Sequence, residues 1–259
     1  MSASVPAIAV ISLWVVYLAA AQLFSTGKRM KMETNFKKEA ALAAVPMIRR
    51  GMTVGLGAGA TIGYLVAAIA EDRTLASSLT LVSSSADTIR LLQQHGLVIT
   101  DAGELAGIDL YFDGCDQVDA DLNAFKSGAG IHAIEKVFAF MAAEFIILAD
   151  AAKFTSKLNT AHPLTMEVLP EAKGKVISTI RERFSTVTVS IRKDAGRPML
   201  TARNNLLTDL RFETLPPLYE LDQLKMLPGV IDHSLFYEIA SGAIIAGEEG
   251  IQKLAQRVK

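Results

Sequence analysis

The chain has few of the residues that form disulfides or hold metal ions. Its 259 residues include one cysteine, Cys115, which excludes an internal disulfide and fits a reducing compartment. We interpret Cys115 as a small buried thiol rather than a nucleophile. The histidines His95, His132, His162 and His233 lie far apart without metal-ligand spacing, so no metal site is expected. The net charge of −1 gives no indication of a nucleic-acid surface.

Charge is absent from the segment Val5–Phe24, which is about long enough to cross a bilayer as a helix. Basic residues such as Lys28 and Arg29 follow it, as in a membrane anchor that leaves the next domain in the cytoplasm. This order makes a cleaved secretory signal less favoured. Alternatively, translation starts at Met30 or Met32 and the segment is not part of the protein. Both interpretations predict a cytoplasmic domain, tethered or free.

Charged residues gather in the middle of the chain, in a span that is otherwise apolar or small. They are Asp113, Asp116, Lys126, Glu135 and Lys136. The segment IDLYFDGCD has the pattern of a buried strand that ends in its own carboxylates. Ligands bind at that end of the strands in open α/β sheets, although a turn formed by Asp and Gly is equally consistent with the pattern.

The segment that follows combines a loop of small residues, KSGAG from Lys126, with helical apolar spacing over 131–145. Glu135 is therefore expected in an early turn of a helix. A carboxylate at that position fits a functional site and fits equally well a partner of the helix dipole. We expect Lys136 to be a neighbour of the site rather than a participant.

Helix and strand patterns alternate from residue 36 to residue 153, which predicts an α/β fold with a Rossmann-like, mainly parallel sheet flanked by helices. The expected helices cover 36–51, 61–71, 89–96 and 131–145, with Gly51 as a carboxyl cap of the first. The expected strands cover 52–56, 79–85, 97–101, 108–116 and 144–153.

The pattern changes near Pro163, where antiparallel β segments with one or two helices predict a smaller α+β domain. The last segment is expected to return to the first domain. The predicted units are an apolar extension, 1–32, an α/β domain, 33–163 with 235–259, and a smaller α+β domain, 164–234.

Five short motifs follow one another along the chain. They are GAGAT from Gly57, SSS from Ser83, DGCDQ from Asp113, KSGAG from Lys126 with IEK containing Glu135, and ADAAK ending at Lys153. In these motifs and their spacing the chain resembles the A-type ribose-5-phosphate isomerases from Met32 onward. The resemblance implies a smaller domain that acts as a lid, a homodimer or homotetramer, and isomerisation of ribose 5-phosphate to ribulose 5-phosphate in the non-oxidative pentose phosphate pathway.

This reaction moves a carbonyl between two carbons, which requires a base. Glu135 is the candidate base, since partial burial raises a carboxyl pKa toward the working pH. Lys126 is the candidate for stabilising the enediolate, and Asp113 and Asp116 for holding the sugar hydroxyls during ring opening. No metal or organic cofactor is required. The candidate substrate-binding residues are Lys37, Gly57, Ala58, Gly59, Ala60, Thr61, Ser83, Ser84, Gly114, Cys115, Ser127, Gly128, Ala129 and Lys153. Lys37 is equally consistent with a solvated helix face.

The glycine loop departs from the GTGST pattern of the family, because Ala58 and Ala60 stand where hydroxyl residues are usual. Each lost hydrogen bond to phosphate would weaken binding by about 1.5–3 kcal/mol. Gln117 replaces an acid, and Ser127 and Ala129 replace glycines. The proton-transfer residues remain, so an active isomerase is the favoured hypothesis. The alternative is a non-catalytic sugar-phosphate binding or sensing protein on the same fold.

Overall fold

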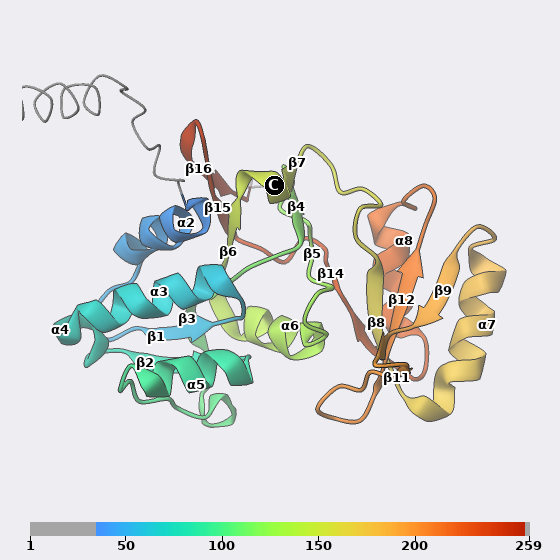
Figure 1. The fold of residues 1–259 in the computed structure, drawn as a ribbon, viewed down its shortest axis with the longest axis horizontal. Helices are drawn as coiled ribbons and strands as arrows, with labels where there is room; N and C mark the ends of the chain where they lie inside the picture. The colour runs from blue at the N-terminus through green and yellow to red at the C-terminus, as the bar shows by residue number, and fades with distance from the viewer. Residues whose placement is uncertain (1–34, 257–259) are drawn as a thin grey trace, which may run out of the picture. The chain divides into compact units, whose positions relative to one another are not determined.

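The computed structural model describes residues 35–256, which carry a six-stranded central sheet in the order β16-β15-β6-β3-β1-β2 (Figure 1). Its strands are β1 (Thr53–Leu56), β2 (Thr80–Ser83), β3 (Ile108–Asp113), β6 (Ala142–Asp150), β15 (Gly242–Gly247) and β16 (Gly250–Ala255). Neighbouring strands are parallel, except that β16 is antiparallel to β15. The mainly parallel sheet predicted from the sequence is confirmed.

Different helices cover the two faces of this sheet. The helices of this part are α2 (Phe36–Ala44), α3 (Ala60–Glu71), α4 (Arg73–Ala76), α5 (Ala86–Gln94) and α6 (His132–Met141), with short turns η1 (Val45–Met47), η2 (Ala102–Glu104) and η3 (Ala151–Lys153). Successive side chains of β3 point to opposite faces. Phe112 therefore packs in one core with α2 and α3, whereas Tyr111 packs in the other with α6.

A four-stranded antiparallel sheet in the order β13-β8-β12-β9 follows in the chain. Its strands are β8 (Leu164–Val168), β9 (Thr188–Ile191), β12 (Leu206–Arg211) and β13 (Val230–His233). Helices α7 (Lys173–Arg183) and α8 (Leu218–Asp222) pack against it through one apolar core. Short elements complete this part: η4 (Pro170–Ala172), β10 (Lys193–Asp194), β11 (Arg197–Pro198) and η5 (Gln223–Met226). We propose residues 164–234 as the smaller domain.

A third sheet, in the order β14-β5-β4-β7, joins segments that are far apart in the chain. Its strands are β4 (Gln117–Asp119), β5 (Ala124–Phe125), β7 (Phe154–Thr155) and β14 (Leu235–Phe236). Beyond it the chain continues as β15 and β16, and β15 pairs with β6 of the central sheet.

Two predicted helices are shorter than expected. The helix expected over 36–51 ends at Ala44, because Pro46 lacks the backbone N–H that the next α-helical hydrogen bond requires, and the chain continues as the short turn η1. Gly51 is thus not a carboxyl cap; it has φ +82° in the turn before β1. The helix expected over 131–145 ends at Met141, since pairing with β3 draws the chain into β6 from Ala142.

The strand predicted over 97–101 is wrong. Only Ile99 pairs there, in an isolated parallel bridge with Leu81 beside β2. A short apolar run does not by itself distinguish a strand from other structure. Here the segment forms a single bridge with β2 rather than a continuous ladder of hydrogen bonds.

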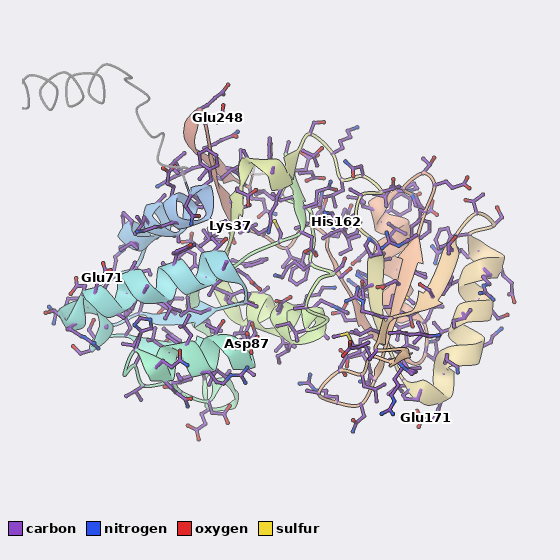
Figure 2. The ribbon with its side chains drawn as sticks, in the orientation of Figure 1. Lys37, Glu71, Asp87, His162, Glu171 and Glu248 are labelled. Atoms are coloured by element: carbon purple, nitrogen blue, oxygen red, sulfur yellow. The ribbon has the colours of Figure 1, made fainter. Side chains whose placement is uncertain are left out.

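No helix among residues 35–256 is long and apolar enough to cross a membrane. The apolar segment Val5–Phe24, for which we considered an anchor or a late translation start, lies outside the described residues. Carboxylates such as Glu71, Asp87 and Glu171 lie exposed on the outside of the fold (Figure 2).

Two glycines near η4 give a test of the packing in the smaller domain. A Cβ at Gly229, which has φ +94°, would lie 2.0 Å from the Cβ of Ala172, whereas a Cβ at Gly174 would meet nothing within 4 Å. We expect Gly229→Ala to lower the free energy of unfolding by about 1–3 kcal/mol. Gly174→Ala, in α7, is the control and should leave it unchanged or raise it by up to about 1 kcal/mol. Urea denaturation measures both; equal midpoints for the two variants would contradict the described packing.

Candidate active site

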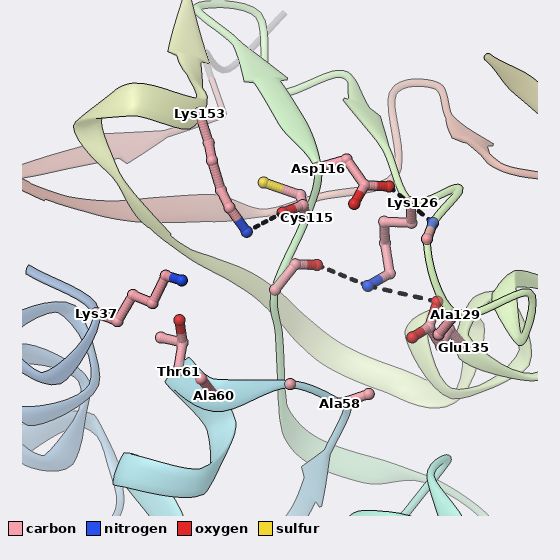
Figure 3. A pocket seen from close by; sticks show the side chains of 13 residues that line it. Lys37, Ala58, Ala60, Thr61, Cys115, Asp116, Lys126, Ala129, Glu135 and Lys153 are labelled. Atoms are coloured by element: carbon pink, nitrogen blue, oxygen red, sulfur yellow. Dashed lines mark hydrogen bonds and ion pairs between the residues drawn. The ribbon is translucent and has the colours of Figure 1, made fainter. Parts of the chain in front are cut away.

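A cavity of about 210 Å³ opens at the carboxyl ends of β1, β3 and β6 (Figure 3). Its lining residues are Lys37, Ala58, Gly59, Ala60, Thr61, Gly114, Cys115, Asp116, Lys126, Gly128, Ala129, Glu135 and Lys153. All thirteen are residues that the sequence predicted for the site. Topology brings them together, because the carboxyl ends of parallel strands share one edge of the sheet.

The centre of the site is a buried lysine between two carboxylates. Lys126 Nζ lies 2.8 Å from Asp113 Oδ2 and 3.4 Å from Glu135 Oε2, and the three side chains are 5%, 0% and 4% exposed, respectively. The same ammonium donates to the backbone oxygen of Gly114 at 2.6 Å. Strand β3 supplies Asp113 at its end, and the first turn of α6 supplies Glu135, as expected.

Asp113 lies behind the cavity rather than in its lining. Its Oδ1 accepts from the backbone N–H groups of Ala58 and Gly114, at 3.0 and 2.7 Å, and its Oδ2 accepts from the hydroxyl of Tyr111 at 2.7 Å. The carboxylate therefore ties the glycine loop to the end of β3. A Cβ at Gly57 would lie 1.9 Å from Asp113 Cγ, so only glycine fits there.

These contacts set the ionisation of the central groups. The pKa of Glu135 is raised to about 8: burial raises it most, the charge of Asp113 also raises it, and Lys126 opposes both. Burial alone would lower the pKa of Lys126, but Asp113 and Glu135 outweigh it and raise that pKa above its ordinary value. Lys126 thus stays charged, while Glu135 exchanges a proton near neutral pH.

Asp116 lines the cavity and holds the loop after Lys126. Its Oδ2 accepts hydrogen bonds from the backbone N–H groups of Ser127 and Gly128 (Figure 3). Lys153 donates to the backbone oxygen of Cys115 at 2.5 Å. Burial raises the pKa of the Cys115 thiol to about 12, which keeps it protonated and agrees with a structural thiol.

The other end of the cavity is suited to an anion. Lys37 and Lys153 point toward the space above Thr61, at the amino end of α3 (Figure 3). Gly59 caps this helix without a side-chain hydrogen bond, so its first N–H groups are available to a ligand. Ala58 and Ala60 present methyl groups in the same place.

Ser83 and Ser84 are not among the residues that line the cavity. Ser83 Oγ donates to the backbone oxygen of Leu56 at 2.7 Å, and Ser84 Oγ lies 3.0 Å from the hydroxyl of Tyr111. Their role in binding stays a prediction. Lys136 pairs with Asp232 of β13 at 2.5 Å and does not line the cavity.

Sequence reasoning missed Tyr111, whose hydroxyl reaches Asp113. The strand period held the signal, because a residue two positions before Asp113 shares its face of the sheet. Residues 35–256 contain no group of three His, Cys, Asp or Glu side chains that could hold a metal ion.

A buried lysine between two carboxylates, next to an anion-binding helix terminus, defines a site suited to proton transfer on an anionic substrate. Residues 80–250 match the family described as ribose 5-phosphate isomerase A, or phosphoriboisomerase A. The ribose-5-phosphate isomerase A of Sinorhizobium medicae is 34% identical over 223 residues, which cover 84% of this chain and 96% of that protein. The chain belongs to the ribose 5-phosphate isomerase A family, which confirms the resemblance seen in its motifs.

Solved structures agree. The ribose 5-phosphate isomerase from Plasmodium falciparum gives a TM-score of 0.79 at 27% identity, over 86% of this chain and 99% of that chain. A D-ribose-5-phosphate isomerase in complex with phospho-erythronic acid gives a TM-score of 0.78 at 27% identity, over 85% and 97%. The predicted fold class is thereby confirmed.

The ion pair between Asp113 and Lys126 allows a prediction of how removing the charge of Asp113 affects stability and the pKa of Glu135. Asp113→Asn leaves Lys126 buried with a weaker partner, so we expect the free energy of unfolding to fall by about 3–5 kcal/mol. The pKa of Glu135 should fall, because Asp113 no longer repels its carboxylate. Asp87→Asn is the control, since Asp87 pairs with Arg90 at 85% exposure and such surface pairs contribute about 0–1 kcal/mol. Denaturation and carboxyl NMR titration measure the two effects; equal destabilisation in both variants would contradict this assignment.

Proposed function

We propose that this chain interconverts D-ribose 5-phosphate and D-ribulose 5-phosphate through an enediolate, in the non-oxidative branch of the pentose phosphate pathway. The observation that carries the proposal is the contact of Lys126 with Glu135 at one end of a cavity whose other end has Lys37, Thr61 and Lys153. Family membership supports the reaction, since the relatives are named for it.

Glu135 acts as the base. It removes the proton from C2 of the open-chain aldose and returns a proton to C1, while the hydroxyl proton of O2 passes to O1, so that the carbonyl ends at C2. A base works best when its pKa is close to the working pH, and burial brings the pKa of Glu135 to about 8. A carboxylate with the ordinary glutamate pKa would be a weaker base and would accept the proton from carbon less readily.

Lys126 stabilises the negative charge that develops on the enediolate oxygens. Its ammonium is held by Asp113 and by the backbone oxygen of Gly114, so it is already oriented before substrate binds. Ala129 lines the same end of the cavity, and its backbone N–H has no acceptor among residues 35–256. This N–H group supplies a second donor to the oxyanion.

The phosphate lies against the amino end of α3. Lys37 and Lys153 supply the charge, and the hydroxyl of Thr61 with the free N–H groups of the helix supplies hydrogen bonds. The methyl groups of Ala58 and Ala60 contribute none, so the two lysines take a larger share of phosphate binding here.

The two aspartates have different roles in this scheme. Asp116 lines the cavity and binds a sugar hydroxyl with the carboxylate oxygen that does not hold the loop. Asp113 is fully buried and has four donors, so it acts on the substrate through Lys126. This arrangement disfavours a purely sensing protein, which has no need of a base beside a buried ammonium.

The assembly and the location extend this proposal. We infer that the chain forms a homodimer or homotetramer and works in the cytoplasm, as the sequence resemblance implies. Its partner in the reaction is a small sugar phosphate.

Replacement of Glu135 tests the reaction directly. Glu135→Gln keeps the shape and removes the base, so kcat should fall by about 10²–10⁴-fold. In the unaltered protein, kcat/KM should rise with pH through the raised pKa of Glu135, because the base must be ionised. Ribulose 5-phosphate formation measures both, and binding of phospho-erythronic acid, retained in the variant, is the folding control. If the unaltered protein binds this ligand but does not convert ribose 5-phosphate, the proposed function is contradicted.

Lys37 and its neighbour Lys38 form a matched pair on α2, since both are exposed and only Lys37 lines the cavity. Lys37→Ala should raise the KM for ribose 5-phosphate about tenfold or more, because a charge-assisted hydrogen bond contributes about 1.5–3 kcal/mol. Lys38→Ala should leave KM within twofold. Equal KM values for the two variants would show that Lys37 does not bind the phosphate and belongs to a solvated helix face.

A further inference from the structure

Arg192, at the end of β9 in the smaller domain, reaches across to the loop that carries Lys126. Its Nη1 donates to the backbone oxygens of Ser127 and Gly128, at 2.8 and 3.1 Å. The side chain is 17% exposed and does not line the cavity. It therefore contacts the loop without being part of the cavity lining.

The remaining donors of the same guanidinium are also occupied. Nε and Nη2 bind the two carboxylate oxygens of Asp209 at 3.0 and 2.7 Å, and Nη2 also donates to Thr165 Oγ1 at 2.8 Å. Thr165 in turn donates to Asp209 at 2.7 Å. All five N–H groups of Arg192 thus have an acceptor, which fixes its plane.

The loop is held from its other side by the α/β domain. The N–H groups of Ser127 and Gly128 donate to Asp116, while their carbonyl oxygens accept from Arg192. The hydroxyl of Ser127 donates to the backbone oxygen of Pro163 at 2.6 Å. The backbone N–H and C=O groups of two successive residues, Ser127 and Gly128, therefore all have partners, directly after Lys126 and before Ala129.

From this geometry we propose that Arg192, oriented by Asp209, is a positioning residue for the isomerisation: it fixes the loop from Lys126 to Ala129 so that the lysine and the Ala129 N–H face the reacting carbons. The inference rests on the proposed function. A lysine at 192 keeps the charge but lacks the planar fork that binds the carboxylate and the two carbonyls together.

Arg192→Lys is the decisive variant, because it keeps the charge and most of the volume. We expect kcat to fall at least tenfold while KM for ribose 5-phosphate changes less than threefold, since the loop faces the reacting end rather than the phosphate end. Lys126 lowers the pKa of Glu135, whereas burial and Asp113 raise it. A displaced Lys126 should therefore raise that pKa and move the acidic limb of the kcat/KM profile to higher pH. Asp209→Asn should shift kcat and the limb in the same directions, and Arg203→Lys, an exposed arginine of the same domain, should leave both unchanged.

The unaltered protein is measured in the same assay, so that its inactivity counts against the proposed function and not against Arg192. Rates are expressed per folded molecule, with thermal unfolding as the check. The inference is overturned if Arg192→Lys is folded and keeps kcat within twofold, if its loss lies wholly in KM, or if its acidic limb does not move. If Arg192→Lys does not fold, Asp209→Asn decides by the same criteria.

Discussion

A lysine ammonium that is 5% exposed cannot remain charged without partners, because an isolated ion away from water is strongly disfavoured. Lys126 finds them in Asp113, Glu135 and the backbone oxygen of Gly114. Asp113 in turn accepts a hydrogen bond from the backbone N–H of Ala58. This contact brings the carboxylate so close to position 57 that only glycine fits there. The end of β3, the glycine loop and the first turn of α6 are therefore fixed relative to one another by one buried charge cluster.

The same cluster divides the cavity into two ends with different electrostatics. At the buried end the positive charge of Lys126 is matched by Asp113, so that burial governs Glu135 and raises its pKa. At the open end Lys37 and Lys153 have no carboxylate partner among the described residues, and positive charge there is left for an anionic group. The proposed substrate, a sugar phosphate, has matching chemistry: reacting carbonyl carbons for the buried end and a phosphate for the open end.

Much of this site could be predicted because its residues follow local patterns. The carboxyl end of a buried strand located Asp113 and Asp116, and helical spacing located Glu135 in its first turn. The end of α2 was also in reach of local reasoning, since Pro46 marks it. The end of α6 could not be predicted in this way. The apolar spacing beyond Met141 also suits a helix, and only the pairing with β3 makes the chain a strand from Ala142. Arg192 carried no local signal, since the loop oxygens of Ser127 and Gly128 that it binds lie more than sixty residues earlier in the chain.

The departures from the family motifs fall where the structure tolerates them. Gln117 does not line the cavity and forms two hydrogen bonds with Asn159, so the missing acid removes no charge from the lining. Ser127 and Ala129 have no left-handed backbone that would require glycine, and the hydroxyl of Ser127 even gains the backbone oxygen of Pro163. Gly130 has φ +70°, and a Cβ there would lie 2.4 Å from a side-chain carbon of Leu207, so this position favours glycine. The substitutions thus leave Asp113, Lys126 and Glu135 in place, while the lining has methyl groups at Ala58 and Ala60 where the family motif has hydroxyl groups.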